Sequence, residues 1–448
     1  MPDPRPSEPV IIVGGGLAGL TTALRLAEAG HGVTVLEGEA QVGGRARTLD
    51  VGGQHVDRGF QSLFTAYSRT ARLLHDVGIA DHDLVAFDRG AVVHDGTRWS
   101  RMAPTPRGVT GFAWFGAGDV LRLARLGAEV AGVPDGALLT GDEQAEDIAG
   151  YLSRLGFSPG AVEGFFRPLF GVITADPTLG SDAAYFRFLM KMLLRGRAVI
   201  PVEGHGMIAE WTAARVRQEG GTVAVDARVA EVLTDPADRG RATGVRLASG
   251  EHRTASAVIL ATGAPAARSL LADLDRQAAR ALDLPARGVT TLVYELGASF
   301  HSGRTIVLNG APRSGGPRVD LVCQESNLLR PDGHGGARLL AACVHGHEGA
   351  RDPDALDAAM RDMAARWNPG FPWARAARLA DVVVHEAAQF AVPPGARECL
   401  PDASTAVEGL FLAGDFTMHP SIEGAVCSGE RAAEVVGSAL ARHGSGGH

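Results

Sequence analysis

The first forty residues contain two apolar runs separated by a segment in which apolar residues recur at helical spacing. This pattern predicts a strand, a helix and a second strand. Residues 10–13 form an uninterrupted apolar run, which is typical of a short buried strand. From residue 17 to about 29, apolar residues recur at helical spacing and give the helix one apolar face. Gly30 ends this helix, and residues 33–36 form a second apolar run. The chain therefore predicts a β–α–β unit near its N-terminus.

Three glycines between the first strand and the helix give the pattern G-x-G-x-x-G. Gly14 permits a tight turn, Gly16 lets a pyrophosphate approach the backbone, and Gly19 lets the helix pack close to the strand. The N-terminus of the helix favours phosphate through its free N–H groups and its dipole. Glu37, at the end of the second strand, can accept hydrogen bonds from a ribose. Because these features occur together, they predict a dinucleotide site rather than a glycine-rich turn without a ligand.

A second glycine-rich turn follows the second strand. Gly43 and Gly44 precede Arg45, on the side of the strand where a pyrophosphate would emerge from the first turn. Arg47 and Arg58 are further cations that could neutralise it. The alternative is an ordinary exposed loop.

The middle of the chain changes character twice. Residues from about 88 to 200 give helical patterns, including an amphipathic segment over 108–132. Residues 222–261 return to short strands, and 286–385 alternate strands with a helix at 353–367. With 448 residues, the chain is too long for one ordinary core, so we expect two domains.

The last predicted strand and helix carry polar residues between them. An apolar run at 410–413 leads into Gly414 and Asp415. A helix then begins near Ser421, which is a suitable N-cap. Glu423 would lie in the first turn of this helix, where an acid is favourable in any protein.

Residues 185–197 predict an amphipathic helix with a basic face. Phe186 and Leu189 belong to the apolar face, whereas Arg187, Lys191 and Arg195 follow one another at four-residue spacing. Such a helix can lie on an anionic membrane surface. The alternative is a helix on the surface of a domain, with cationic side chains that extend along it.

Composition and charge restrict the class of protein. Apolar residues make up 45% of the chain and charged residues 21%, and the formal net charge of −8 does not suggest a nucleic-acid partner. The four cysteines form no C-x-x-C pair, which favours a reducing compartment and argues against zinc or a disulfide framework. The N-terminal segment has no apolar core of a signal peptide, and no run of 18 apolar residues could span a membrane. We therefore expect a cytoplasmic protein, with peripheral membrane contact as an alternative.

Several of these motifs together resemble one family. They are the glycine fingerprint, the G-G-R turn, the A-T-G at 261–263, and the block A-G-D, S-I-E-G-A and S-G near the C-terminus. In this order they resemble the FAD-dependent superfamily of flavin amine oxidases, carotenoid desaturases and protoporphyrinogen oxidases. The resemblance extends over nearly the whole chain and is strongest over 10–60 and 410–436.

The resemblance implies an α/β fold in which two domains are interleaved. A Rossmann-like FAD-binding domain would comprise 8–87, 201–285 and 386–441. A substrate-binding domain of sheet plus helices would comprise 88–200 and 286–385. Residues 1–7 and 442–448 would be flexible tails.

The resemblance also implies cofactor-binding roles. FAD would be bound by Gly14, Gly16, Leu17, Ala18, Gly19, Glu37, Gly43, Gly44, Arg45, Arg58, Gly59, Val229, Gly414, Asp415 and Ile422. The first turn would hold the pyrophosphate and Val229 the adenine. Arg58 and Gly59 would lie near the flavin ring, and Gly414 and Asp415 beside the ribityl chain and the pyrophosphate. Ile422 would place a helix N-terminus at the pyrimidine edge of the flavin, which stabilises the anionic reduced form. No cysteine matches the pattern for covalent attachment, so we expect non-covalent FAD.

Two departures separate this chain from the amine oxidases of the family. Those enzymes usually place an aromatic residue of an amine-binding cage where this chain has Ser421, and they tend to use a lysine near the flavin that Lys191 does not match well. The segments 165–177, 201–207 and 420–425 look more like the bacterial phytoene- and squalene-desaturase branch.

The expected function is therefore a desaturase or dehydrogenase. It would transfer hydride from a C–H bond of a hydrophobic substrate, such as an isoprenoid, to flavin N5, with O2 or a quinone as the final acceptor. The alternatives are an oxidase of an amine or a secondary metabolite, a redox-neutral flavin isomerase, and a non-catalytic protein that binds prenylated partners.

No catalytic base is assigned from the sequence. Phe60, His419 and Ser421 are weak candidates for the substrate side. His205 and Glu423 are better interpreted as structural residues. The H-G-H of 345–347 with Glu348 has ligand-type side chains but no further ligands at fixed spacing, so we expect a polar loop and no metal.

Overall fold

A computed structural model describes most of the chain. The described residues are 8–50, 55–59, 61, 63–139, 145–235, 237, 240–313, 315–329, 337–344 and 351–445. The predicted tail 1–7, Phe60 and the 345–348 motif lie outside them. Over 442–445 the predicted C-terminal tail is instead the end of a long helix, α15 (Ile422–Ser445).

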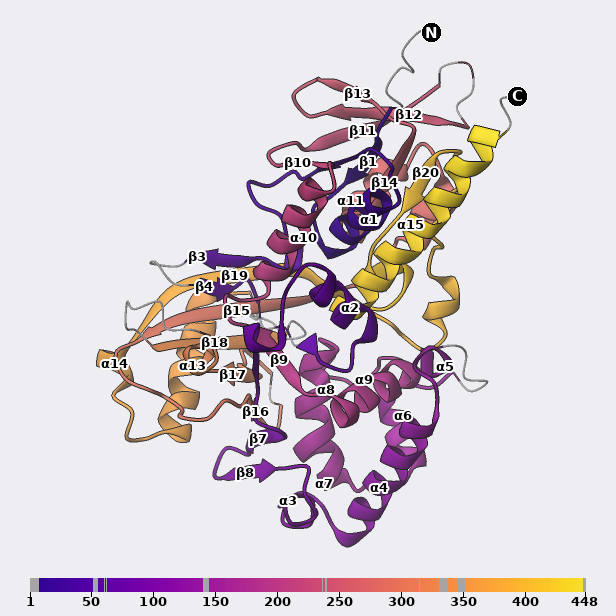
Figure 1. Cartoon of the computed structure of the whole chain (residues 1–448). Coiled ribbons are helices and arrows are strands. Elements are labelled where there is room, and N and C mark those ends of the chain that lie inside the picture. The colour runs from indigo at the N-terminus through magenta and orange to yellow at the C-terminus, as the bar shows by residue number, and fades with distance from the viewer. Residues whose placement is uncertain are drawn as a thin grey trace.

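The predicted β–α–β unit forms the centre of a parallel sheet (Figure 1). The strand order is β10-β2-β1-β14-β20, and all four pairings are parallel. These strands are β1 (Val10–Val13), β2 (Val33–Leu36), β10 (Thr222–Ala224), β14 (Ala257–Leu260) and β20 (Leu410–Leu412). Helix α1 (Leu17–Glu28) packs against α15 and α10 (Gly206–Gln218). Because parallel strands need covering helices, this apolar sheet is buried, and the predicted Rossmann-like domain is confirmed.

A small antiparallel sheet and two helices complete this part of the protein. The sheet contains β11 (Val229–Thr234), β12 (Ala242–Leu247) and β13 (His252–Thr254). Helices α11 (Ala264–Leu271) and α12 (Arg276–Ala281) follow β14. They share a core with the other face of the parallel sheet, where Ile11, Val258 and Leu271 are buried.

The second domain is built on a seven-stranded sheet in the order β19-β15-β18-β17-β16-β7-β8. Its strands are β7 (Ala91–His94), β8 (Trp99–Met102), β15 (Ala286–Leu296), β16 (Val307–Asn309), β17 (Leu321–Cys323), β18 (Ala337–Val344) and β19 (Ala377–Phe390). Helix α13 (Pro353–Trp367), followed by α14 (Trp373–Ala376), covers one face, where Tyr294, Met360 and Trp367 share a core. The long strand β19 continues past the predicted domain boundary at residue 386.

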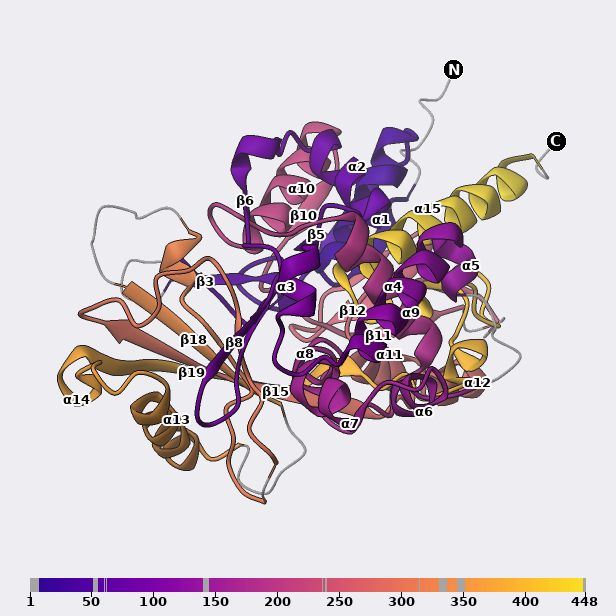
Figure 2. The ribbon, with the colours of Figure 1, turned by 90° about the horizontal axis from the view of Figure 1, so that it is seen from below.

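A helical lobe forms the other part of the second domain and lies at the far end of the molecule from β11–β13 (Figure 1). Seen from below, the lobe helices lie beside the seven-stranded sheet and α13 (Figure 2). Its helices are α3 (Pro106–Thr110), α4 (Ala117–Gly132), α5 (Asp135–Leu139), α6 (Ile148–Arg154), α7 (Pro159–Ala161), α8 (Arg167–Ile173) and α9 (Ala183–Arg195). Its core is rich in aromatic residues; Phe166, Phe170 and Phe186 contact one another at ring-centroid distances of 4.6–6.3 Å.

Short strands and one helix connect the lobe to the Rossmann-like domain. These are β3 (Thr48–Asp50) with β4 (His55–Asp57), β5 (Leu63–Phe64), β6 (Leu84–Ala86) and β9 (Ala198–Pro201), and helix α2 (Ser68–Asp76).

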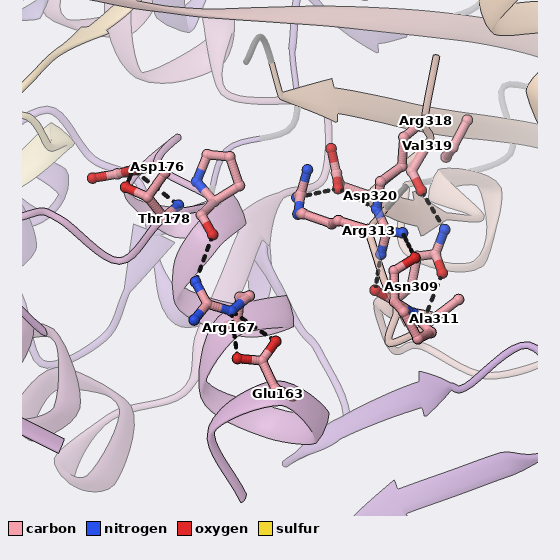
Figure 3. Close-up of polar contacts among 12 residues, drawn as sticks. Glu163, Arg167, Asp176, Thr178, Asn309, Ala311, Arg313, Arg318, Val319 and Asp320 are labelled. Carbon is pink, nitrogen blue, oxygen red and sulfur yellow. Dashed lines mark hydrogen bonds and ion pairs between the residues drawn. The ribbon is translucent and has the colours of Figure 1, made fainter. Parts of the chain in front are cut away.

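Arginine–carboxylate pairs lie on both sides of the junction between the lobe and the large sheet (Figure 3). At the start of α8, Arg167 binds Glu163 at 2.9 Å and donates to the Pro177 carbonyl. On the other side, Arg313 and Arg318 both bind Asp320. These pairs hold the loops that flank α8.

The predicted basic face of helix 185–197 is not a free surface. Within α9, Lys191 is buried and binds Asp135 at 2.6 Å and the Val133 carbonyl. Arg187 binds Glu129 at 3.3 Å. Lys191 and Arg187 therefore do not extend freely over the surface, because acids of α4 and α5 pair with them, whereas Arg195 is exposed and lies 3.9 Å from Asp135.

Candidate functional site

A cavity of about 730 Å³ runs between the two domains. One end, which we call the sheet end, lies at the carboxyl ends of β1 and β2. The other, the lobe end, lies against α8 and α9. Fourteen of the predicted cofactor residues line it: Gly14, Gly16, Leu17, Ala18, Glu37, Gly43, Gly44, Arg45, Arg58, Gly59, Val229, Gly414, Asp415 and Ile422. The structure therefore gathers segments from residue 13 to residue 425 around one space.

The first glycine turn has the geometry that the sequence predicts. Gly14 has φ +112°, and a Cβ there would lie 2.7 Å from the Ala261 carbonyl oxygen. Gly16 faces open space, because a Cβ there would meet no atom within 4 Å. Gly19 does not line the cavity. Its Cβ would overlap the Gly14 carbonyl oxygen, so this glycine serves the close packing of α1 on β1.

The carboxylate of Glu37 is fixed at the sheet end of the cavity. Its Oε2 accepts a hydrogen bond of 2.6 Å from the Gly15 N–H, and its Oε1 accepts one of 2.9 Å from the Glu39 N–H. Two backbone donors thus orient the side chain while both oxygens keep further lone pairs for a ligand.

Arg45 and Asp415 form an ion pair in the wall of the cavity. The Nη2–Oδ1 distance is 2.7 Å, and Nη1 also donates to the Ala388 carbonyl at 3.0 Å. The charge of Asp415 raises the pKa of Arg45. Gly414 is fixed beside it, since its N–H donates to Ser428 Oγ at 2.8 Å. The pair joins the second glycine turn to the start of the C-terminal segment.

Arg58 is a cation without an ion pair among the described residues. Burial and the neighbouring charge of Arg47 lower its pKa. A partly buried cation that faces another cation is stabilised by an anion. The cavity wall thus contains a cation without a described counter-ion and, at Gly16, a stretch of backbone that faces open space.

His385 is a cavity residue that the sequence did not reveal. Its Nε2 lies 3.1 Å from the Arg58 carbonyl oxygen, which can only accept, so Nε2 carries the proton. The Nδ1 atom of the neutral ring therefore has a free lone pair. Burial and the charges of Arg58, Arg45 and Arg47 lower the pKa of His385. Nothing in the local sequence marks this residue, because it occupies an ordinary position within the long strand β19.

The lobe end of the cavity is apolar. Its lining residues are Phe64, Tyr67, Val172, Ile173, Tyr185 and Leu189. The hydroxyl of Tyr185 donates to the Pro420 carbonyl at 2.9 Å, and burial raises the pKa of both tyrosines, so both are neutral. Gln389, which also lines the cavity, donates to the Ile173 carbonyl at 2.8 Å.

The weak substrate-side candidates have different positions. Ser421 lines the cavity, and its Oγ accepts from the Gly424 N–H at 3.0 Å, which confirms it as the N-cap of α15. His419 does not line the cavity; it is buried behind Ser421, whose Oγ lies 2.9 Å from its Nδ1. Burial, with a smaller contribution from Arg397, lowers the pKa of His419 to about 3. His419 is therefore neutral at physiological pH.

Glu423 and His205 make contacts that explain their burial. Glu423 accepts hydrogen bonds from the Arg69 and Thr70 N–H groups and from Thr70 Oγ1, so it caps the start of α2. His205 pairs through Nδ1 with the buried Asp57, which also accepts from the His205 N–H at 2.8 Å.

Other chemistry is absent from the part of the chain that the structure describes. No group of three or more histidine, cysteine or acidic side chains is placed to hold a metal ion. Of the four cysteines, Cys323 and Cys343 are buried in the second domain, and none of the four lines the cavity. No described helix has both the length and the apolar character needed to cross a bilayer.

Comparisons with known proteins identify the family. A model of the family described as flavin containing amine oxidoreductase matches residues 17–437. Coproporphyrinogen III oxidase of Mycobacterium tuberculosis is 32% identical over 126 residues, which are 27% of this chain and 28% of that protein. Zeta-carotene desaturase of Zea mays is 38% identical over 81 residues, or 18% of this chain and 14% of that protein. The matches thus span less than a third of these relatives.

Solved structures with the same fold cover nearly the whole chain. An oxidoreductase from Methanosarcina mazei has a TM-score of 0.74 at 16% identity and covers 95% of this chain and 99% of its own. A putative protoporphyrinogen oxidase from Exiguobacterium has a TM-score of 0.71 at 17% identity and covers 96% of this chain and 98% of its own. Cyclohexylamine oxidase from Brevibacterium oxydans has a TM-score of 0.70 at 18% identity and covers 97% of this chain and 100% of its own. The chain belongs to the flavin containing amine oxidoreductases, a family of flavin-dependent oxidoreductase enzymes.

Proposed function

We propose that this protein is an FAD-dependent desaturase or dehydrogenase that acts on a hydrophobic substrate such as an isoprenoid. The observation that carries the proposal is the distribution of charge in the cavity. Of its described charged residues, Glu37, Glu39, Arg45, Arg228 and Asp415 come from segments beside the parallel sheet and β11, whereas Arg58 follows β4 and lies against His385 of β19. The lobe end presents apolar side chains and neutral tyrosines.

FAD is the flavin that suits this cavity, and we propose that it is held without a covalent bond. A volume of about 730 Å³ is in the range of cofactor sites. The turn at Gly16 and the cation Arg58 would hold the diphosphate, Glu37 the ribose, and the N-terminus of α15 at Ile422 the ring. The absence of cysteine from the described lining supports non-covalent binding. A bound flavin supplies the capacity to accept a hydride from a substrate C–H bond.

The protein's own contribution would be orientation and exclusion of water. Phe64, Ile173 and Leu189 would enclose an apolar substrate at the lobe end, where its burial provides the binding energy. His385 would hold the Arg58–Gly59 backbone through its bond to the Arg58 carbonyl. The hydride carries both electrons of the C–H bond to the cofactor. Formation of the double bond also releases a proton from the neighbouring carbon, which would leave to solvent, and no residue is assigned to accept it.

An amine oxidase is the second candidate, since the family includes amine-oxidising enzymes. A substrate ammonium needs a carboxylate or an aromatic cage. Of the three carboxylates of the described lining, Asp415 is paired with Arg45 and Glu39 with Arg228 at 2.9 Å, and Glu37 lies at the sheet end, where it would bind the ribose. Glu423 caps α2, and the predicted cage position is Ser421. This arrangement favours the apolar substrate.

The electron acceptor is testable with the purified holoenzyme. The flavin is reduced without oxygen and then mixed either with air-saturated buffer or with a short-chain quinone, and its absorbance is followed. We expect slow reoxidation by O2 over minutes and acceleration by the quinone. Reoxidation by O2 within seconds, with peroxide release and flavin reduction by amines, would refute the desaturase proposal in favour of an oxidase.

A further inference from the structure

His385 is the one neutral nitrogen base in the described lining of the cavity. Its Nε2–H donates to the Arg58 carbonyl, so Nδ1 keeps its lone pair, and no described group donates to that atom. The carboxylates of the lining are paired with arginines or lie at the sheet end, and burial raises the pKa of both tyrosines. Among the described lining residues, His385 is therefore the group best suited to accept a proton near neutral pH.

His385 lies beside Arg58, on a strand that continues to the lobe end. A Cβ added to Gly59, which lines the cavity, would lie 3.6 Å from the Cδ2 atom of His385 and 3.8 Å from the Oγ1 atom of Thr291. Thr291 belongs to the neighbouring strand β15 and is fully buried, and its Oγ1 has no hydrogen-bond partner among the described residues. Farther along β19, Gln389 donates to helix α8 at the lobe end. Two polar atoms beside Gly59 are thus open to a ligand, at the side of the cavity where a substrate would enter from the lobe end.

We propose that His385 is the first acceptor of the proton that double-bond formation releases from the substrate. This inference rests on the proposed dehydrogenation and adds a residue to it. The substrate loses two C–H bonds. One hydrogen leaves as a hydride, with both bonding electrons, to the flavin; the other leaves as a proton to Nδ1 of His385, and its bonding electrons form the double bond. His385 returns this proton to solvent once the flavin has been reoxidised.

The charges around His385 suit this role. Burial and three neighbouring cations lower its pKa, which keeps the ring neutral before the reaction; the cations are Arg58, Arg45 and Arg47. The nearby acids have partners of their own, since Asp57 of β4 pairs with a buried histidine and Glu386 of β19 with an exposed arginine. The phosphates of FAD would offset the three cations, and the electrons that reduce the flavin would add negative charge. Protonated His385 is therefore favoured only when the cofactor is bound and reduced.

The test compares the flavin potential of the wild-type holoenzyme with that of His385→Gln. The glutamine amide can still donate to the Arg58 carbonyl but cannot take up a proton. Midpoint potentials are measured without oxygen, with dithionite and reference dyes, between about pH 6.5 and 8. Each proton taken up with the two electrons changes the equilibrium tenfold per pH unit, which is about 30 mV. The potential of the wild type should therefore fall more steeply than that of His385→Gln, by about 30 mV per pH unit.

His419→Gln is the matched control, because His419 is also a neutral histidine but is buried behind Ser421, outside the described lining. It should keep the slope of the wild type. If His385→Gln does not bind FAD, the wild type alone decides, since a slope of only about 30 mV per pH unit would overturn the inference. Equal slopes for the wild type and His385→Gln would overturn it and leave the proposed function standing, whereas a wild-type protein that binds no flavin would refute both.

Discussion

Replacing Gly16 and Gly19 separately with alanine should uncouple flavin binding from folding. At Gly16 the backbone is extended, with φ −75° and ψ 175°, and an added Cβ would meet no protein atom within 4 Å. The fold should therefore tolerate the methyl group, and reduced freedom of the unfolded chain could add about 0.4–1 kcal/mol of stability. The same methyl group would stand in the cavity, where we place the diphosphate.

At Gly19 the outcome should be the reverse. The Cβ would overlap the Gly14 carbonyl oxygen and lie 3.0 Å from the Ala261 Cβ. Helix α1 would have to move away from β1, and overpacking of this kind costs about 1–3 kcal/mol or more. Gly19→Ala should lower the stability of the protein even when flavin is absent.

The assay combines two measurements on each variant. Thermal unfolding of flavin-free protein, followed by circular dichroism, reports the fold, and titration with FAD, followed by quenching of its fluorescence, reports the site. We expect Gly16→Ala to unfold like the wild type but to bind FAD at least tenfold more weakly, a loss of about 1.4 kcal/mol. If Gly16→Ala binds FAD as tightly as the wild type, Gly16 does not face the cofactor and the proposed placement of the diphosphate is refuted.

Three further predictions concern buried polar groups. His419→Gln should make the free energy of unfolding less dependent on pH in the acid range. Because the pKa of His419 is lowered to about 3 in the folded protein, protonation of the unfolded chain below about pH 6.5 lowers the stability of the wild type by about 1.4 kcal/mol per pH unit. Urea titrations at several pH values would measure this difference. Glu423→Ala should lower the free energy of unfolding by about 1–3 kcal/mol, because two N–H groups of α2 lose their acceptor, and Glu423→Gln should recover part of this loss in the same urea titration. Arg45→Ala should cost about 1–2 kcal/mol, because it leaves the buried Asp415 without its cation, while the 41% exposure of Arg45 weakens the pair by solvent screening. Adding Asp415→Asn should restore part of this stability, and a double mutant as unstable as the single one would contradict the ion-pair interpretation.

The sequence was most informative where neighbouring residues determine the structure. The turn between β1 and α1 depends on glycines only a few positions apart, and each occupies the position that its predicted role requires. The N-cap role of Ser421 was equally local. The domain boundaries stay a prediction, although β19 shows that one strand belongs to both predicted parts.

Partners from distant segments were beyond the reach of the sequence pattern. Lys191 has a helical spacing that suits a surface, yet Asp135 and the Val133 carbonyl bury it. His385 enters the site only because β19 passes beneath Arg58, more than 300 positions away in the chain. Such pairings depend on topology, and helical or strand periodicity carries no information about them.

The pairing of β20 with β14 sets an order for biosynthesis. These strands are about 150 residues apart in the chain, with Val258 opposite Leu410. Until β20 leaves the ribosome, β14 is an open sheet edge with apolar faces, and neither Asp415 nor Ile422 can complete the cavity wall. The nascent protein therefore cannot close around its cofactor until the segment from β20 to Ile422 has left the ribosome, and until then the open edge of β14 is where a chaperone would bind.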